Sequence, residues 1–126
     1  MILIAVCLAT PAFAARNDDP EAPLQKALAG RTAGPPVDCI ISSSTDSSQI
    51  IDRKAILYRI GSRIFVNEPR SGADTLREDD ILVTRTFGSR LCSRDMVQLI
   101  HRGSRFPGRY ISLGKFVPYS RVKAVK

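Results

Sequence analysis

The sequence predicts a mostly β domain: small antiparallel sheets, partly closed into a barrel or roll, with one short N-terminal helix. Several short apolar segments follow one another between residues 39 and 117, and no long helical pattern separates them. Apolar residues make up 44% of the chain, which argues against global disorder. The length of 126 residues leaves room for one domain with a modest core.

The first fourteen residues have the pattern of a cleavable signal peptide. An apolar run from Ile2 to Ala9 is followed by Ala12-Phe13-Ala14, the small-x-small pattern at which signal peptidase cleaves. The run is too short to span a bilayer, which requires about 20 apolar residues. No basic residue precedes it, which leaves open a true start farther upstream. We therefore expect residues 1–14 to be removed and the mature chain to be periplasmic or secreted, with no transmembrane segment.

A short helix is expected over residues 20–29, after a loose segment at 15–19. Asp19 can cap its start, Pro20 suits the first turn, and Gly30 suits the stop. Leu24 and Leu28 fall on one face. A helix this short is not stable alone, so we expect it to dock on the domain formed by residues 20–119, which a basic tail at 120–126 follows.

The strands are expected at residues 39–41, 55–60, 63–67, 81–87, 96–100 and 110–117, the last ended by Pro118. The clearest signal is the hairpin around Gly61-Ser62, since glycine at the first central position fits a type II′ turn. Its register pairs Tyr58 with Phe65 and Leu57 with Val66. Both faces are then partly apolar, as in a barrel or sandwich. The serine-rich residues 42–49 fit either a loop or a polar edge strand.

Removal of the signal leaves two cysteines, Cys39 and Cys92. In an exported chain the simplest arrangement is one disulfide between them, and the alternative is two separate buried thiols. A zinc site would need more ligands than these two cysteines and His101, the only histidine, can supply.

Basic charge is concentrated in the second half of the chain. Residues 81–126 hold ten Lys or Arg and one Asp, whereas residues 1–80 hold nine basic and eleven acidic residues. Arg102, Arg105 and Arg109 flank glycine and proline in an expected loop, where arginines suit phosphate. We expect these three to bind anionic envelope components, namely lipid phosphates or lipopolysaccharide. The alternative is that the charge only keeps the domain soluble.

Other candidate sites are weak. The acidic residues Asp74, Glu78, Asp79 and Asp80 lack the spacing of a calcium loop and fit a solvated turn. His101 and Ser104 lie in no nucleophile-elbow motif. The absence of Trp and of an aromatic-rich strand argues against a nucleic-acid partner. We therefore predict no catalytic residue, no cofactor and no metal site, and the sequence leaves the oligomeric state open.

Four segments together resemble a family of uncharacterised exported proteins of Gram-negative bacteria, a domain of unknown function. They are Val37–Ile40, Ile51–Arg59, Leu82–Thr86 with Leu91-Cys92, and Leu113–Pro118. The resemblance implies an exported single domain and supplies no activity. Members often carry four cysteines, and the other two positions fall near Ala73 and Ile111 here, which fits Cys39 and Cys92 being partners.

These features favour a non-enzymatic envelope protein that binds or supports a partner through its basic face. One alternative is an inhibitor of a secreted or host enzyme, for which small disulfide-closed β domains are good scaffolds. The basic charge of this chain argues against the version of this alternative in which the target is itself basic, such as lysozyme. A third possibility is an enzyme of a type that no motif identifies.

Overall fold

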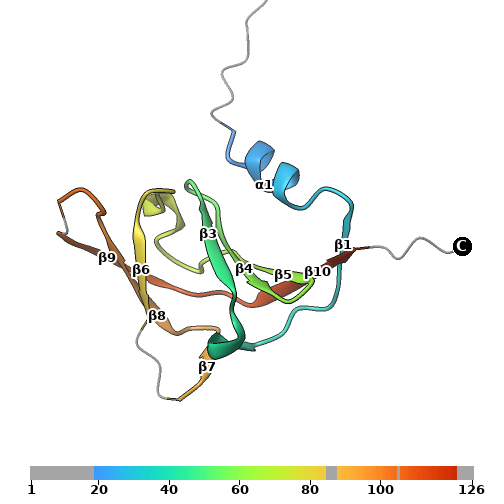
Figure 1. Cartoon of the computed structure of the whole chain (residues 1–126). Coiled ribbons are helices and arrows are strands. Elements are labelled where there is room, and N and C mark those ends of the chain that lie inside the picture. Colours follow the sequence, from blue (N-terminus) through green and yellow to red (C-terminus); the bar gives the residue numbers. More distant parts are fainter. Residues whose placement is uncertain (1–18, 85–87, 105, 122–126) are drawn as a thin grey trace, which may run out of the picture.

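The computed structural model describes residues 19–84, 88–104 and 106–121, which form three antiparallel β-sheets and one α-helix (Figure 1). The elements are α1 (Glu21–Ala27), β1 (Arg31–Ala33), β2 (Cys39–Ile41), β3 (Ser47–Ile51), β4 (Ala55–Ile60), β5 (Arg63–Asn67), β6 (Ile81–Thr84), β7 (Arg90–Cys92), β8 (Met96–Ile100), β9 (Pro107–Ser112) and β10 (Phe116–Arg121), with 3₁₀ helices at Ser42–Ser44 and Ala73–Thr75. The predicted mostly β, antiparallel fold with an N-terminal helix is confirmed. No sheet closes into a barrel within the described residues.

The largest sheet has the strand order β1-β10-β5-β4-β3. Its centre is the β4–β5 hairpin, whose predicted register is confirmed: Tyr58 pairs with Phe65 and Leu57 with Val66. Gly61 adopts a φ of +59°, as a type II′ turn requires at its first central position. The serine-rich segment that the sequence left undecided begins with a 3₁₀ turn and continues as β3, an edge strand.

Alternate side chains of this hairpin enter two different apolar clusters. Ile56 and Tyr58 belong to the larger cluster, whereas Ala55 and Leu57 belong to a smaller one on the opposite face. The helix α1 covers the smaller cluster with Leu24 and Leu28, as predicted. The predicted docking of the helix is therefore confirmed, and both faces of the central sheet are covered.

Polar contacts also hold the helix in place. The Asp19 carboxylate accepts a hydrogen bond from the Glu21 N–H at 3.0 Å, although Pro20 occupies the N-cap position. Lys54 Nζ lies 3.2 Å from Glu21 Oε2 and 3.3 Å from Glu68 Oε1. Hydrogen bonds to Glu21 and Glu68 raise the pKa of Lys54, and a hydrogen bond from Gln25, followed by one from Lys54, lowers the pKa of Glu21.

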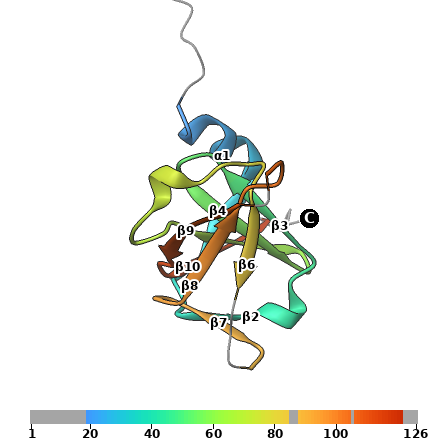
Figure 2. The same cartoon turned by 90° about the vertical axis from the view of Figure 1, so that its left-hand side faces the viewer.

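The larger cluster is closed by the other two sheets, β6-β8-β9 and β2-β7 (Figure 2). Val97, Leu99 and Ile111 are buried beneath the three-stranded sheet, and Ile40 and Leu91 are buried beneath the two-stranded sheet. Tyr58 meets the ring of Phe116 edge-on, with 5.7 Å between the ring centroids. The chain thus packs a helix, the five-stranded sheet and the two smaller sheets in successive layers.

The strand prediction was wrong for residues 110–117 and for Pro118, and it missed two strands. Residues 110–117 do not form one strand, because Leu113, Gly114 and Lys115 separate β9 from β10. Pro118 lies inside β10 and does not end it; β10 continues through Arg121. β1 and β7 were not expected at all. The predicted strand at 81–87 is observed over Ile81–Thr84, and residues 85–87 lie outside the described part.

Cys39 and Cys92 lie directly opposite each other in the β2–β7 pair and are joined by a disulfide. They are 53 residues apart in the sequence. In the chain-entropy model, closing a loop of this length stabilises the fold by roughly 4 kcal/mol. The predicted pairing is therefore present, and it joins the ends of two short strands that have few other pairing residues.

The only buried polar residue among those described is Asn67, at the end of β5. Its Nδ2 donates a hydrogen bond to the Gly114 carbonyl at 2.8 Å, and its Oδ1 accepts one from the Gly114 N–H at 2.9 Å. The side-chain amide therefore satisfies both backbone groups of a buried residue between β9 and β10. A β-carbon on Gly114 would collide with the Glu68 carbonyl oxygen, so only glycine fits at this crossing.

We predict that Asn67→Ala lowers the free energy of unfolding by about 2–4 kcal/mol, because two buried backbone groups lose their partners. Chemical denaturation monitored by circular dichroism measures this. Asn67→Asp is the matched isosteric variant. Its ionised carboxylate would face the Gly114 carbonyl, so its folded-state pKa should rise, and its stability relative to wild type should increase as pH falls and the acid becomes a donor. A loss below 0.5 kcal/mol for Asn67→Ala, roughly the range of surface substitutions, would contradict the role given to Asn67.

Non-reducing peptide mapping should recover the peptides containing Cys39 and Cys92 as one species. Cys92→Ser should lower the free energy of unfolding by about 2–5 kcal/mol, the usual range for a small secreted domain. The double replacement Cys39→Ser/Cys92→Ser is the control, since it removes the bridge without leaving a lone thiol. Free thiols on both Cys39 and Cys92 in protein isolated without a reducing agent would refute the bridge.

Candidate functional site

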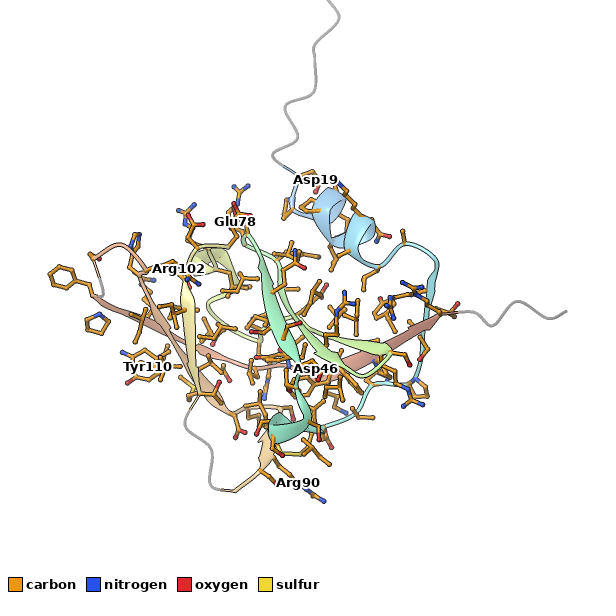
Figure 3. All side chains as sticks on the ribbon, viewed as in Figure 1. Asp19, Asp46, Glu78, Arg90, Arg102 and Tyr110 are labelled. Carbon is orange, nitrogen blue, oxygen red and sulfur yellow. A yellow bond between two sulfur atoms is a disulfide. The ribbon has the colours of Figure 1, made fainter. Side chains whose placement is uncertain are left out.

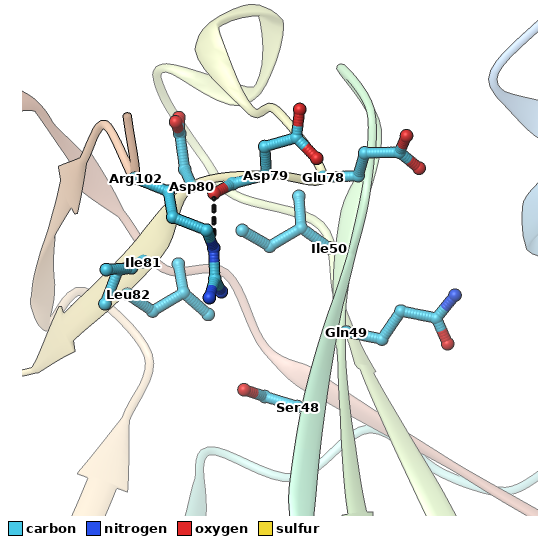
Figure 4. Close-up of a pocket in the computed structure, with 9 residues that line it drawn as sticks. All are labelled: Ser48, Gln49, Ile50, Glu78, Asp79, Asp80, Ile81, Leu82 and Arg102. Carbon is cyan, nitrogen blue, oxygen red and sulfur yellow. Dashed lines mark hydrogen bonds between the residues drawn. The ribbon is translucent and has the colours of Figure 1, made fainter. Parts of the chain in front are cut away.

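The three arginines singled out from the sequence lie around the β8–β9 turn, and they are not equivalent. Arg102 is exposed, but its Nε donates a hydrogen bond to the Asp79 carbonyl at 3.2 Å (Figure 4). It lines a hollow of about 420 Å³ that Glu78, Asp79 and Asp80 also line. The local acids offset its charge, so Arg102 is a poor anion ligand. Arg105 lies outside the described residues. Arg109, in β9, is exposed.

Arg109 directly precedes Tyr110 in β9, and Tyr110 belongs to an exposed apolar surface. The outer face of the β6-β8-β9 sheet, meaning the side turned away from the larger core cluster, carries Ile81, Met96 and Tyr110. Phe106, immediately before β9, is 72% exposed, and Tyr110 is 52% exposed. Four of the six exposed large apolar side chains among the described residues therefore belong to this sheet and its turn. Figure 3 shows Tyr110 on the side of the molecule away from α1.

The acidic residues before β6 and the segment from His101 to Ser104 take part in local turn contacts. The Glu78 N–H donates a hydrogen bond to Asp52 Oδ1, which fixes the turn before β6. No three His, Cys, Asp or Glu side chains among the described residues are placed to hold a metal ion. His101 is exposed, and the Ser104 hydroxyl accepts a hydrogen bond from the Phe106 N–H at 3.4 Å, a contact within the turn.

A second basic group is brought together by the fold. Arg70, Arg94 and Lys115 line a hollow of about 670 Å³ together with Asp38 and Ser93. These three cations come from three different connections: the one after β5, the turn between β7 and β8, and the crossing between β9 and β10. They are more than 20 residues apart in the sequence. No local motif marks them; the general excess of basic residues after residue 80 includes Arg94 and Lys115 but gives no signal for Arg70.

Searches against protein-family models, curated proteins and solved structures returned no match to this chain. The resemblance to exported proteins of unknown function stays a prediction. Within the described residues, no helix has the length and apolar character needed to cross a membrane.

Proposed function

We propose that this chain is an exported, non-enzymatic binding protein of the cell envelope that attaches to anionic phospholipid surfaces. The outer face of the β6-β8-β9 sheet makes the contact. The observation that carries the proposal is the position of Phe106 and Tyr110, which are the two most exposed large apolar residues in the described part of the chain. Tyr110 lies in a strand that also exposes Arg109, and Phe106 lies directly before that strand.

The chemistry of this face suits the boundary between water and lipid. Aromatic side chains insert into the headgroup region, and tyrosine keeps its hydroxyl in water while burying its ring. Arginine donates two parallel hydrogen bonds to a lipid phosphate. The sheet is held by the apolar cluster on its inner face, so insertion of the outer face requires no unfolding.

Charge supports the same partner. The segment from residue 81 onward has ten basic residues against one acid, a formal charge of +9. Such a surface is attracted to anionic lipid, and the attraction weakens with salt. The apolar contribution of Phe106 and Tyr110 does not weaken with salt. We therefore expect binding that falls with ionic strength but keeps a salt-resistant remainder.

Co-sedimentation with vesicles tests this proposal. The protein should sediment with vesicles containing phosphatidylglycerol and not with pure phosphatidylcholine. Replacing Arg102, Arg105 and Arg109 together by Ser should remove most of the salt-sensitive part of this binding with little change in thermal stability. Among single variants, Arg109→Ser should lose more binding than Arg102→Ser, whose guanidinium is held at Asp79.

Phe106→Ser should weaken partitioning about tenfold, since about half of a phenyl side chain's transfer free energy is lost. Ile41→Ser is the matched control: Ile41 is 51% exposed, but it lies in β2, outside the proposed contact. Equal binding to both kinds of vesicle, or equal losses for Phe106→Ser and Ile41→Ser, would remove this face from consideration. Binding to lipopolysaccharide but not to phosphatidylglycerol would also overturn the choice of phospholipid.

A further inference from the structure

The crossing between β9 and β10 is fixed by backbone hydrogen bonds from two other segments. The Arg70 N–H donates to the Ser112 carbonyl at 2.8 Å, and the Arg94 N–H donates to the Leu113 carbonyl at 2.9 Å. The Leu113 N–H donates to the Asp95 carbonyl at 3.0 Å, and Asn67 holds both backbone groups of Gly114. Residues 70, 94 and 115 are therefore held at fixed positions around one buried glycine.

All three of those residues are cationic and exposed. The Arg70 side chain passes over the crossing, with its Cγ 3.7 Å from the position that a β-carbon on Gly114 would occupy. Lys115 directly follows Gly114. The three side chains project from a backbone that is held in place. Less conformational entropy is therefore lost when they bind a ligand than would be lost if they were carried by a mobile loop.

Arg94 has a conformation that is unusual for its residue type. Its φ is +75°, in the left-handed region that glycine occupies without strain. If the turn required only this backbone conformation, glycine would adopt it with less strain than arginine does. Strained positions of this kind occur often at ligand sites, where the side chain has a role that glycine cannot fill.

The hollow has an excess of positive charge. Its one carboxylate, Asp38, lies 3.8 Å from Lys115 Nζ, and both side chains are more than half exposed, so this ion pair is weak. No carboxylate or carbonyl pairs with the guanidinium of Arg70 or Arg94 among the described residues. The nearby Asp95 carboxylate is directed at the backbone of β7, because its Oδ2 accepts a hydrogen bond from the Cys92 N–H at 2.7 Å.

We propose that Arg70, Arg94 and Lys115 form a discrete binding site for a phosphate group. Two planar guanidiniums and one ammonium match the oxygens of a phosphate, which can accept from all three at once. Lys115 exchanges its weak contact with Asp38 for the ligand. The site uses none of the residues of the proposed lipid contact and does not depend on that proposal.

Titration of isotope-labelled protein with inorganic phosphate, at constant ionic strength against sodium chloride, tests the site by NMR. Backbone amide shifts should saturate and centre on residues 94 and 113–115. Arg94→Gly should weaken the apparent affinity about tenfold, because one charged hydrogen-bonding partner is lost. Glycine suits the positive φ, so this variant should fold normally. Asp38→Asn should strengthen phosphate binding about threefold, because it removes a negative charge that repels the phosphate and keeps the shape of the side chain.

Arg53→Gly is the matched control. Arg53 also has a positive φ, +57°, in the turn between β3 and β4, so this variant loses the same charge and gains the same backbone relief. It should leave phosphate binding unchanged. Equal weakening by Arg53→Gly and Arg94→Gly, or shifts that do not saturate, would overturn the site and leave only a general charge effect.

A second arm identifies the source of the phosphate group. Soluble glycerol phosphate and phosphatidylglycerol vesicles are each tested with wild type and Arg94→Gly. A loss confined to glycerol phosphate supports a free phosphate ester, and an added loss of vesicle binding supports a lipid headgroup. No loss with either probe counts against the site. Failure of the Phe106 variants to affect vesicle binding would contradict the lipid contact alone.

Discussion

Both faces of the β4–β5 hairpin carry large apolar side chains, so neither face can be left against water. Leu57 and Val66 require a cover on one side, and α1 supplies it; Ile56 and Tyr58 require a cover on the other, and the two smaller sheets supply it. The chain passes from the second cover into the central sheet at Gly114, where a buried backbone would lack partners without Asn67. The layers, this crossing between sheets and the buried amide of Asn67 thus follow from the same hairpin.

Local patterns predicted the parts of the fold that depend on neighbouring residues. The register around Gly61 was confirmed, because turn type and alternation both act within a dozen residues. The break at Gly114 was missed, because its cause lies 47 residues away in Asn67. Pro118 was expected to end a strand. The Pro118 carbonyl accepts a hydrogen bond from the Gly34 N–H, just past the end of β1. The N–H that proline lacks would therefore face a position where the pairing between β1 and β10 has already ended.

The same limit applies to the candidate sites. Arg102, Arg105 and Arg109 could be grouped from the sequence because they are close along the chain, yet Arg102 turned out to lie among acids of the connection before β6. Arg70, Arg94 and Lys115 could not be grouped, since only the crossing at Gly114 brings them together. The excess of basic residues after residue 80 could be read from the sequence, but where the fold gathers that charge could not.

The central claim is that the placement of positive charge, and not its total, determines what the protein binds. The most direct measurement uses a variant that keeps the net charge of +7: Arg94→Gln and Arg109→Gln, compensated by Ala29→Lys and Thr32→Lys at exposed positions near the N-terminus. Binding of inorganic phosphate and of phosphatidylglycerol vesicles is compared with wild type at equal ionic strength. The account predicts that both are strongly reduced in a variant that remains folded. Binding equal to wild type in both assays would contradict it and leave the charge as a property of the whole surface.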